Sequence, residues 1–237
     1  MSLRSLPHCL PRPLRLLAWS LAVAGLAAQA AGTVREQEMA QCLPQEVTTW
    51  GDGSDRPAGV LALRLVVRHD DAPPWFGAGQ VLAMVDRAAQ AWAGCGIGVQ
   101  VQALASGAPV PDGAVLVSWS DERAAGHFGL ANLRTRTLAL GPAAFRLLNS
   151  RNPAHPAQDT LQMVLSHEMG HFFGLMAHSR RCVDVMSYYD NGKGERCFTR
   201  DGQVPTGRTD YRALLPTACD IARCRAVNAG ALLSRAP

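Results

Sequence analysis

The stretch "SHEMGHFFGLMAHS", Ser166 to Ser179, contains a His-Glu-x-x-His motif, the pattern on which the expected fold depends. His167 and His171 are four residues apart, so on a helix they lie one turn apart on the same face. Two imidazoles at that spacing can bind one tetrahedral Zn²⁺ through ring nitrogens. Glu168, next to the first histidine, is placed to reach a water rather than the metal. The stretch therefore predicts a zinc site carried by a helix.

The helix that carries the motif is expected to begin near Asp159 and to end at Gly174. Asp159 can cap the helix, and Gln162 three residues later fits a capping box. Glycine is a common stop just after a helix. Apolar residues recur between these ends at helical spacing: Leu161, Val164, Leu165 and Phe172. One face of the helix is therefore expected to be buried.

The motif alone can arise by chance, and the sequence that follows it makes it more specific. His178 lies four residues after Gly174, and "VMSYY" at Val185–Tyr189 begins seven residues later. This order of helix, glycine, third histidine and later methionine resembles the metzincin clan of zinc endopeptidases. The "MSY" string looks most like the methionine turn of serralysins and astacins.

Two further stretches resemble matrixins. "AAQAWAGCGIGVQV" at residues 88–101 is similar to their helix-to-strand join, and "GHFGLANL" at residues 126–133 is similar to the edge strand that binds substrate. The resemblance covers about Gly59 to Asn228, but only Ser166–Tyr189 is specific. It implies a mixed α/β (α+β), metzincin-like fold with a twisted sheet and an active-site helix. The catalytic domain would span residues 59–237, with an upper subdomain at 59–178 and a smaller lower one at 179–237.

The resemblance also implies site residues. One catalytic Zn²⁺ would be held by His167, His171 and His178, above an apolar floor made by Met186. Glu168 would be the general base toward a zinc-activated water, and Tyr188 a zinc ligand or a stabiliser of the transition state. The substrate-binding residues would be Gly129, Leu130, Ala131 and Asn132 on the edge strand, and Tyr189 beside the pocket for the side chain after the cut.

The third ligand is the weakest part of the predicted site. In metzincins it usually follows the glycine by three residues, and here that position is Ala177, which cannot bind metal. His178 is the next residue, and a loop can absorb one added residue at modest cost. Asp184 and His155 remain alternatives for this ligand.

The rest of the chain alternates between predicted strands and helices. Strands are expected at Gly59–His69, after the glycine-rich end of the first helix near Gly98, at Gly113–Ser120, and as two short segments in "HFGLANL" and "RTLALG". Helices are expected at Gln80–Trp92 and around Thr217–Val227. This order predicts helices packed on a mixed sheet.

The first 30 residues have the pattern of a signal peptide. Arg4, Arg12 and Arg15 make a basic start, Leu14–Ala28 is an apolar run, and "AQA" supplies the small residues of a cleavage site. An uncleaved membrane anchor is the alternative. Cleavage would leave a secreted or periplasmic protein with no membrane segment and would lower the net charge from +4 to +1. A net charge this close to zero gives no electrostatic reason to expect that the protein binds nucleic acid. Residues 31–58 are polar and turn-rich, which suggests an N-terminal extension.

Six cysteines remain after Cys9 is removed with the signal peptide, and an even set in an exported chain predicts three disulfides. Six cysteines allow 15 pairings, and nearness in sequence favours Cys182–Cys197, Cys219–Cys224 and Cys42–Cys95. A second possibility for Cys42 is that its thiolate caps the zinc.

These features predict an exported, monomeric zinc metalloendopeptidase, a hydrolase acting on protein or peptide substrates. Two alternatives stay open. The first is a zinc-stabilised binding or adhesion protein that has lost catalysis, although a structural zinc needs no neighbouring base such as Glu168. The second is an aminopeptidase of narrow specificity.

Overall fold

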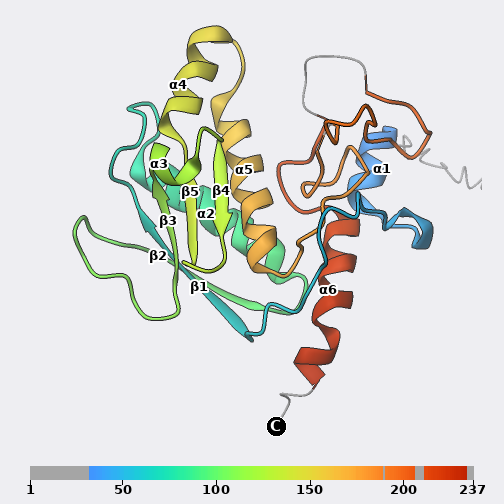
Figure 1. The fold of residues 1–237 in the computed structure, drawn as a ribbon, viewed down its shortest axis with the longest axis horizontal. Helices are drawn as coiled ribbons and strands as arrows, with labels where there is room; N and C mark the ends of the chain where they lie inside the picture. The colour runs from blue at the N-terminus through green and yellow to red at the C-terminus, as the bar shows by residue number, and fades with distance from the viewer. Residues whose placement is uncertain (1–31, 189, 206–210, 234–237) are drawn as a thin grey trace, which may run out of the picture. The chain divides into compact units, whose positions relative to one another are not determined.

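The computed structural model describes residues 32–188, 190–205 and 211–233, and these are built around one five-stranded sheet (Figure 1). The strand order is β2-β1-β3-β5-β4. The first four of these strands are parallel, and β4 runs antiparallel to β5 at the edge. The predicted mixed α/β class is therefore confirmed. The predicted signal peptide lies outside the described residues.

The strands are β1 (Ala62–Arg68), β2 (Gly98–Ala103), β3 (Val115–Trp119), β4 (Gly129–Asn132) and β5 (Thr137–Leu140). The helices are α1 (Val34–Ala40), a 3₁₀ turn η1 (Pro44–Glu46), α2 (Ala78–Ala93), α3 (Asp121–Ala124), α4 (Pro142–Arg151), α5 (Ala157–Phe172) and α6 (Ala218–Leu233).

The main core lies between one face of the sheet and the helices α2 and α5, which also pack on each other. Alternate residues of β1, such as Leu63 and Leu65, face these helices, while Val66 joins a small cluster on the opposite face. Trp92 of α2 is fully buried, and its indole Nε1 donates a hydrogen bond of 2.8 Å to the carbonyl of Ser166 in α5. The motif helix is thereby fixed to the core.

The predicted strands and the helices α2, α5 and α6 are all confirmed, whereas α1, α3 and α4 were not anticipated. The predicted cap at Asp159 is wrong, because α5 already begins at Ala157 with Pro156 as its N-cap. The backbone N–H of Asp159 donates to the carbonyl of Pro156. Asp159 instead lies in the first turn, where a carboxylate complements the helix dipole.

Two of the three predicted disulfides are wrong. Cys182–Cys197 is confirmed, but the other bonds are Cys42–Cys219 and Cys95–Cys224. The physical reason is that Cys219 and Cys224 lie on the same helix, α6. At five residues apart they point about 140° away from each other, so each binds a different partner. Because both bonds reach α6 from distant parts of the chain, nearness in sequence could not reveal them.

Residues 33–58 are packed against the C-terminal part of the chain. Glu38 of α1 and Glu46 of η1 both form ion pairs with Arg181, and Glu38 and Arg181 are almost completely buried. Arg200 adds a second ion pair to Glu46. The disulfide from Cys42 to α6 closes the same contact. This segment is thus part of the structure that surrounds the site, and its boundary as an extension remains a prediction.

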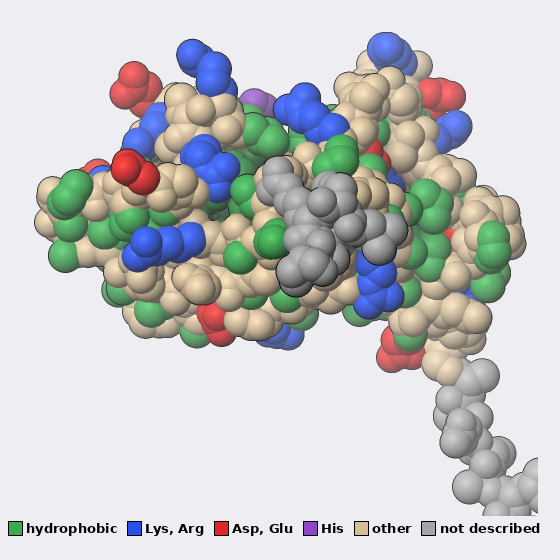
Figure 2. All heavy atoms as spheres, turned by 90° about the horizontal axis from the view of Figure 1, so that it is seen from below, with side chains coloured by type: hydrophobic (Ala, Val, Ile, Leu, Met, Phe, Trp, Pro, Cys, Tyr) green, Lys and Arg blue, Asp and Glu red, His purple; other side chains and the backbone are tan. Residues whose placement is uncertain are grey.

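On the surface drawn in Figure 2, Lys and Arg side chains are scattered among acidic, polar and apolar ones rather than gathered in one stripe. None of the described helices combines the length and the apolar composition needed to cross a membrane.

We predict that Arg181→Met lowers the free energy of unfolding by about 3–5 kcal/mol, because it leaves the buried Glu38 carboxylate without its ionic partner. Arg180→Met is the matched control, since Arg180 is more exposed and lies 3.9 Å from Glu195. Its loss should be about 1 kcal/mol or less. Urea denaturation of both variants checks this, and equal losses would contradict the structural role given to Arg181.

Candidate metal centre

The methionine turn lies directly beneath the motif helix. Met186 is fully buried, and a Cβ added to Gly170 would lie 2.3 Å from its sulfur and 2.8 Å from Trp92. Glycine between Glu168 and His171 therefore lets α5 rest on Met186 and Trp92 together. The carbonyl of Val185, just before Met186, accepts a hydrogen bond from the Nδ1 of His167 at 2.7 Å.

The helix ends in a Schellman motif that turns the chain back toward the site. The N–H of Leu175 donates to the carbonyl of Gly170, and the N–H of Gly174 donates to that of His171. Gly174 has φ +102°, which a side chain disfavours, and a Cβ there would lie 2.3 Å from the carbonyl oxygen of Arg56. The predicted stop at Gly174 is confirmed, and the reversal brings His178 beside α5.

The side chains of His167, His171 and His178 form one cluster. One ring nitrogen from each lies within 4.8 Å of the others. The Nδ1 of each ring faces an atom that can only accept a proton: the carbonyl of Val185, the carbonyl of Leu175 and the carboxylate of Asp52, at 2.7, 2.7 and 2.8 Å. Nδ1 therefore carries the proton in each ring, which leaves the Nε2 lone pair for a metal.

The charge state of the cluster also suits a metal. Burial lowers the pKa of His167 well below its ordinary value, lowers that of His171 to about 4, and lowers that of His178. All three rings are thus neutral at pH 7, the form in which imidazole binds a metal. Three neutral nitrogen donors are the ligand set of many catalytic zinc sites, so the residues fit Zn²⁺.

Residues Trp50–Arg56 hold His178 in place. The Asp52 carboxylate accepts hydrogen bonds from the His178 backbone N–H at 2.9 Å and from its ring Nδ1 at 2.8 Å. The Asp55 carboxylate accepts from the N–H groups of Met176 and Ala177 at 2.8 and 3.0 Å, and pairs with Arg223. This loop replaces the missing helical support for the third ligand.

Local sequence patterns do not reveal Asp52 and Asp55, because these residues lie more than 120 positions before the loop that they hold. They belong to the polar run "GDGSDR", which has the composition of a solvated turn. No spacing within the chain distinguishes them from surface aspartates. Only the folded arrangement reveals their contacts.

The alternatives for the third ligand lie elsewhere. The Asp184 carboxylate is buried and accepts hydrogen bonds from Ser179 and Thr217 at 2.6 and 2.7 Å. His155 contacts the hydroxyl of Thr160 at 2.8 Å. Cys42, the candidate thiolate cap, is held in a disulfide with Cys219.

Glu168 lies between the histidine cluster and the edge strand β4. Its Oε2 accepts a hydrogen bond of 2.9 Å from the N–H of Ala131. A Cβ on Gly129 would lie 2.4 Å from Val164 and 3.0 Å from the Cγ of Glu168, so glycine allows β4 to lie directly on α5. Burial raises the pKa of Glu168 to about 7, although the hydrogen bond from Ala131 and the charge of Arg212 oppose this shift. A carboxyl group with that pKa can both take up and release a proton near neutral pH.

Tyr188 packs against the third histidine. Its ring stacks on that of His178 with centroids 3.8 Å apart, and its hydroxyl donates to Asp52 at 2.8 Å. Burial, followed by the hydrogen bond with Asp52, raises the pKa of Tyr188 above its ordinary value, so the hydroxyl stays protonated. Of the predicted substrate-binding residues, Leu130 and Asn132 are exposed on β4, and Tyr189 lies outside the described residues.

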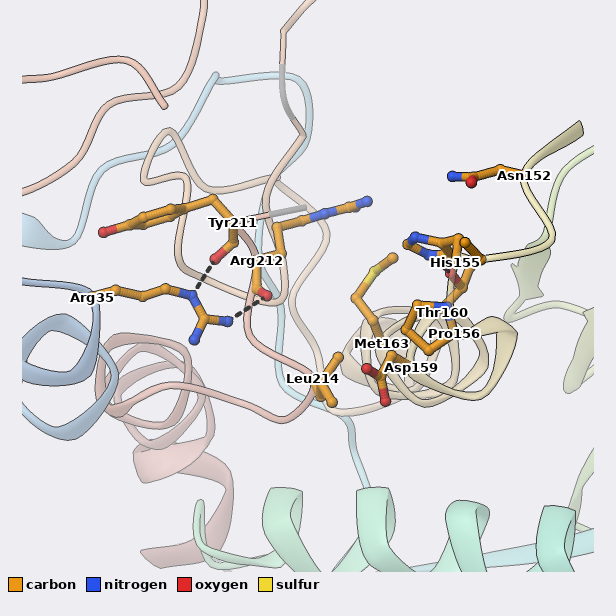
Figure 3. A pocket seen from close by; sticks show the side chains of 11 residues that line it. Arg35, Asn152, His155, Pro156, Asp159, Thr160, Met163, Tyr211, Arg212 and Leu214 are labelled. Carbon is orange, nitrogen blue, oxygen red and sulfur yellow. Dashed lines mark hydrogen bonds between the residues drawn. The ribbon is translucent and has the colours of Figure 1, made fainter. Parts of the chain in front are cut away.

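A cavity of about 660 Å³ lies beside α5 on the side of the C-terminal segment (Figure 3). Thr160 and Met163, from the turns of α5 before His167, line one wall, and Tyr211, Arg212 and Leu214 line another. Arg35 of α1 donates to the carbonyls of Tyr211 and Arg212 at 2.9 and 3.0 Å and so supports that wall. The cavity is large enough for a substrate side chain.

Comparison with known proteins gives several partial similarities among solved structures. One is a chain of the GM1-bound form of the ECX AB5 holotoxin, at TM-score 0.44 and 15% identity over 80% of this chain and 92% of that chain. Another is archaemetzincin from Methanopyrus kandleri, at TM-score 0.42 and 17% identity over 71% of this chain and 96% of that chain. No family model and no curated protein matches. Because both TM-scores lie below 0.5, these similarities do not assign the chain to a family.

We predict that Asp52→Asn weakens zinc binding by about 10- to 100-fold, the usual effect of removing a partner that orients a histidine ligand. Competition with a chromophoric chelator measures the affinity. Asp70→Asn, an exposed aspartate after β1, is the control and should bind zinc as the wild type does. Unchanged affinity in Asp52→Asn would show that His178 needs no support from Asp52.

Proposed function

We propose that the protein is a zinc-dependent endopeptidase of metzincin type. The observation that carries this proposal is the convergence of three neutral imidazoles, each with Nδ1 hydrogen-bonded, next to a half-buried glutamate of α5 that accepts a hydrogen bond from the edge strand β4. A purely structural zinc would not need Glu168, so this arrangement favours catalysis over a binding or adhesion role. His167, His171 and His178 would be the ligands, with Met186 beneath them.

The zinc ion, when bound, supplies a Lewis acid that polarises the scissile carbonyl and makes water more acidic. Glu168 would take a proton from the attacking water and pass it to the leaving amine, as a general base that becomes an acid. The Tyr188 hydroxyl would donate its hydrogen bond to the developing oxyanion instead of to Asp52. Oxyanion donors of this kind contribute about 3 kcal/mol.

The substrate is proposed to lie extended along β4, at Gly129–Asn132, where an edge strand can add a peptide to the sheet through backbone bonds. The N–H of Ala131 faces the site and is bonded to Glu168. One substrate side chain would enter the cavity beside Met163. Residues 59–178 and 179–237 would be the two subdomains on either side of this cleft. Tyr189 to Asn191 would flank the pocket for the side chain after the cut.

Export through the signal peptide is part of the proposal. The three disulfides, which connect residues as far as 177 positions apart, are consistent with an oxidising compartment. Secretion or a periplasmic location, action as a monomer and protein or peptide substrates complete the proposed function.

We predict that Glu168→Gln lowers kcat/KM on an internally quenched peptide with blocked ends by at least about 10²-fold, because general acid–base catalysis contributes about that much. Its zinc content, measured by atomic absorption, should stay near one ion per chain. Glu36→Gln, an exposed glutamate in α1, is the control. Retained cleavage in Glu168→Gln would refute the mechanism, and cleavage only of peptides with a free amino end would point to an aminopeptidase.

A further inference from the structure

A second, smaller cleft of about 160 Å³ lies against the metal centre on the side of His171. Leu133, just after the edge strand β4, lines it together with Gly174 and Met176 from the turn that leads to His178. The cleft therefore touches both the chain just after the strand on which a peptide would lie and the loop that carries the third histidine. Its volume suits one short side chain.

The cleft is positively charged. Arg56 and Arg136 both line it, and no acidic side chain of the described residues does. Arg56 is the last residue of the loop that holds His178, and its backbone N–H donates to the carbonyl of Gly174 at 3.0 Å. Two arginines on one small cleft favour an anion there, because an anion reduces the repulsion between their like charges.

Arg136 lacks the partners that an enclosed arginine normally has. Its Nε is buried and has no hydrogen-bond partner, and no ion pair of its side chain occurs among the described residues. No carboxylate of the described residues therefore neutralises the charge of Arg136, so an anion in the cleft would lower its electrostatic free energy. Its backbone also has φ +52°, an uncommon conformation for a side-chain-bearing residue, often found at functional sites.

The larger cavity beside Met163 does not have this unneutralised positive charge. Its Arg35 already donates to two carbonyl oxygens, and Asp159 supplies a carboxylate to the lining. The cavity beside Met163 therefore gives no comparable reason to expect an anion.

We propose that the cleft formed by Arg56 and Arg136 binds the carboxylate of an Asp or Glu side chain on the part of the peptide that passes His171. The inference rests on the proposed function and assigns it a substrate class, acidic peptides. A planar guanidinium can bind a carboxylate through two parallel hydrogen bonds, which gives selectivity over the neutral amide of the same shape.

Binding and cleavage are tested separately with end-blocked peptides in which one Glu, or one Gln in its place, is moved through each position. Blocked ends ensure that the only carboxylate is that of the side chain. Fluorescence anisotropy with the zinc-loaded Glu168→Gln protein measures binding without cleavage. At one position we expect the Glu peptide to bind about 10- to 100-fold more tightly than the Gln peptide, as charge-assisted hydrogen bonds allow.

The variants identify the group responsible. Arg136→Gln should abolish the preference for Glu, Arg136→Lys should keep part of it, and Arg136→Glu should reverse it toward a Lys peptide. Arg134→Gln, an exposed arginine in the same turn, should leave it unchanged. Melting temperatures show whether each variant is folded.

Equal binding of the Glu and Gln peptides at every position, or a preference that survives Arg136→Gln, would overturn the inference. Cleavage by the wild type without a preference for acidic peptides would overturn it while leaving the proposed function intact. A preference in binding that depends on Arg136, with no cleavage by the wild type, would support the cleft and refute the peptidase.

Discussion

The carboxylate of Asp52 accepts three hydrogen bonds, two from His178 and one from Tyr188, and the geometry of the metal centre depends on them. His167 and His171 are positioned by α5 itself, because they lie one turn apart on a helix fixed to the core. His178 has no such support, since the helix ends before it. The Asp52 contacts supply that support from a segment far away in sequence.

This dependence explains why residues 33–58 are held so firmly. This segment is anchored at two places in the C-terminal part of the chain. Glu38 and Glu46 form ion pairs with Arg181, which precedes the methionine turn, and Cys42 forms a disulfide with α6, which follows it. Asp55 holds the loop between Gly174 and His178 by accepting hydrogen bonds from the N–H groups of Met176 and Ala177, and its own carboxylate is paired with Arg223. The added residue before His178 is thus accommodated by a loop that has its own hydrogen-bonded scaffold.

Much of this arrangement could be predicted from local sequence patterns. The alternation of apolar residues revealed β1 and β3, and the four-residue spacing placed His167 and His171 on one face of a helix. Gly174 and the short distance to His178 indicated a reversal that the Schellman motif provides. These predictions succeeded because each depends on residues within a few turns of one another.

The parts that sequence could not reveal depend on contacts between distant segments. Asp52 resembles any aspartate of a polar turn until His178 is beside it. Cys219 and Cys224 are neighbours in sequence, yet they face different sides of α6 and bind Cys42 and Cys95. The anionic preference proposed for the cleft likewise depends on Arg56 and Arg136, which only the fold brings together.

The central claim is that three imidazoles hold one zinc ion. X-ray absorption at the zinc edge of the loaded protein tests it most directly, because outer-shell scattering counts imidazole ligands. The account predicts three imidazole nitrogens at about 2.0–2.1 Å and one further light ligand. Two imidazoles with a carboxylate, or any sulfur ligand, would contradict it.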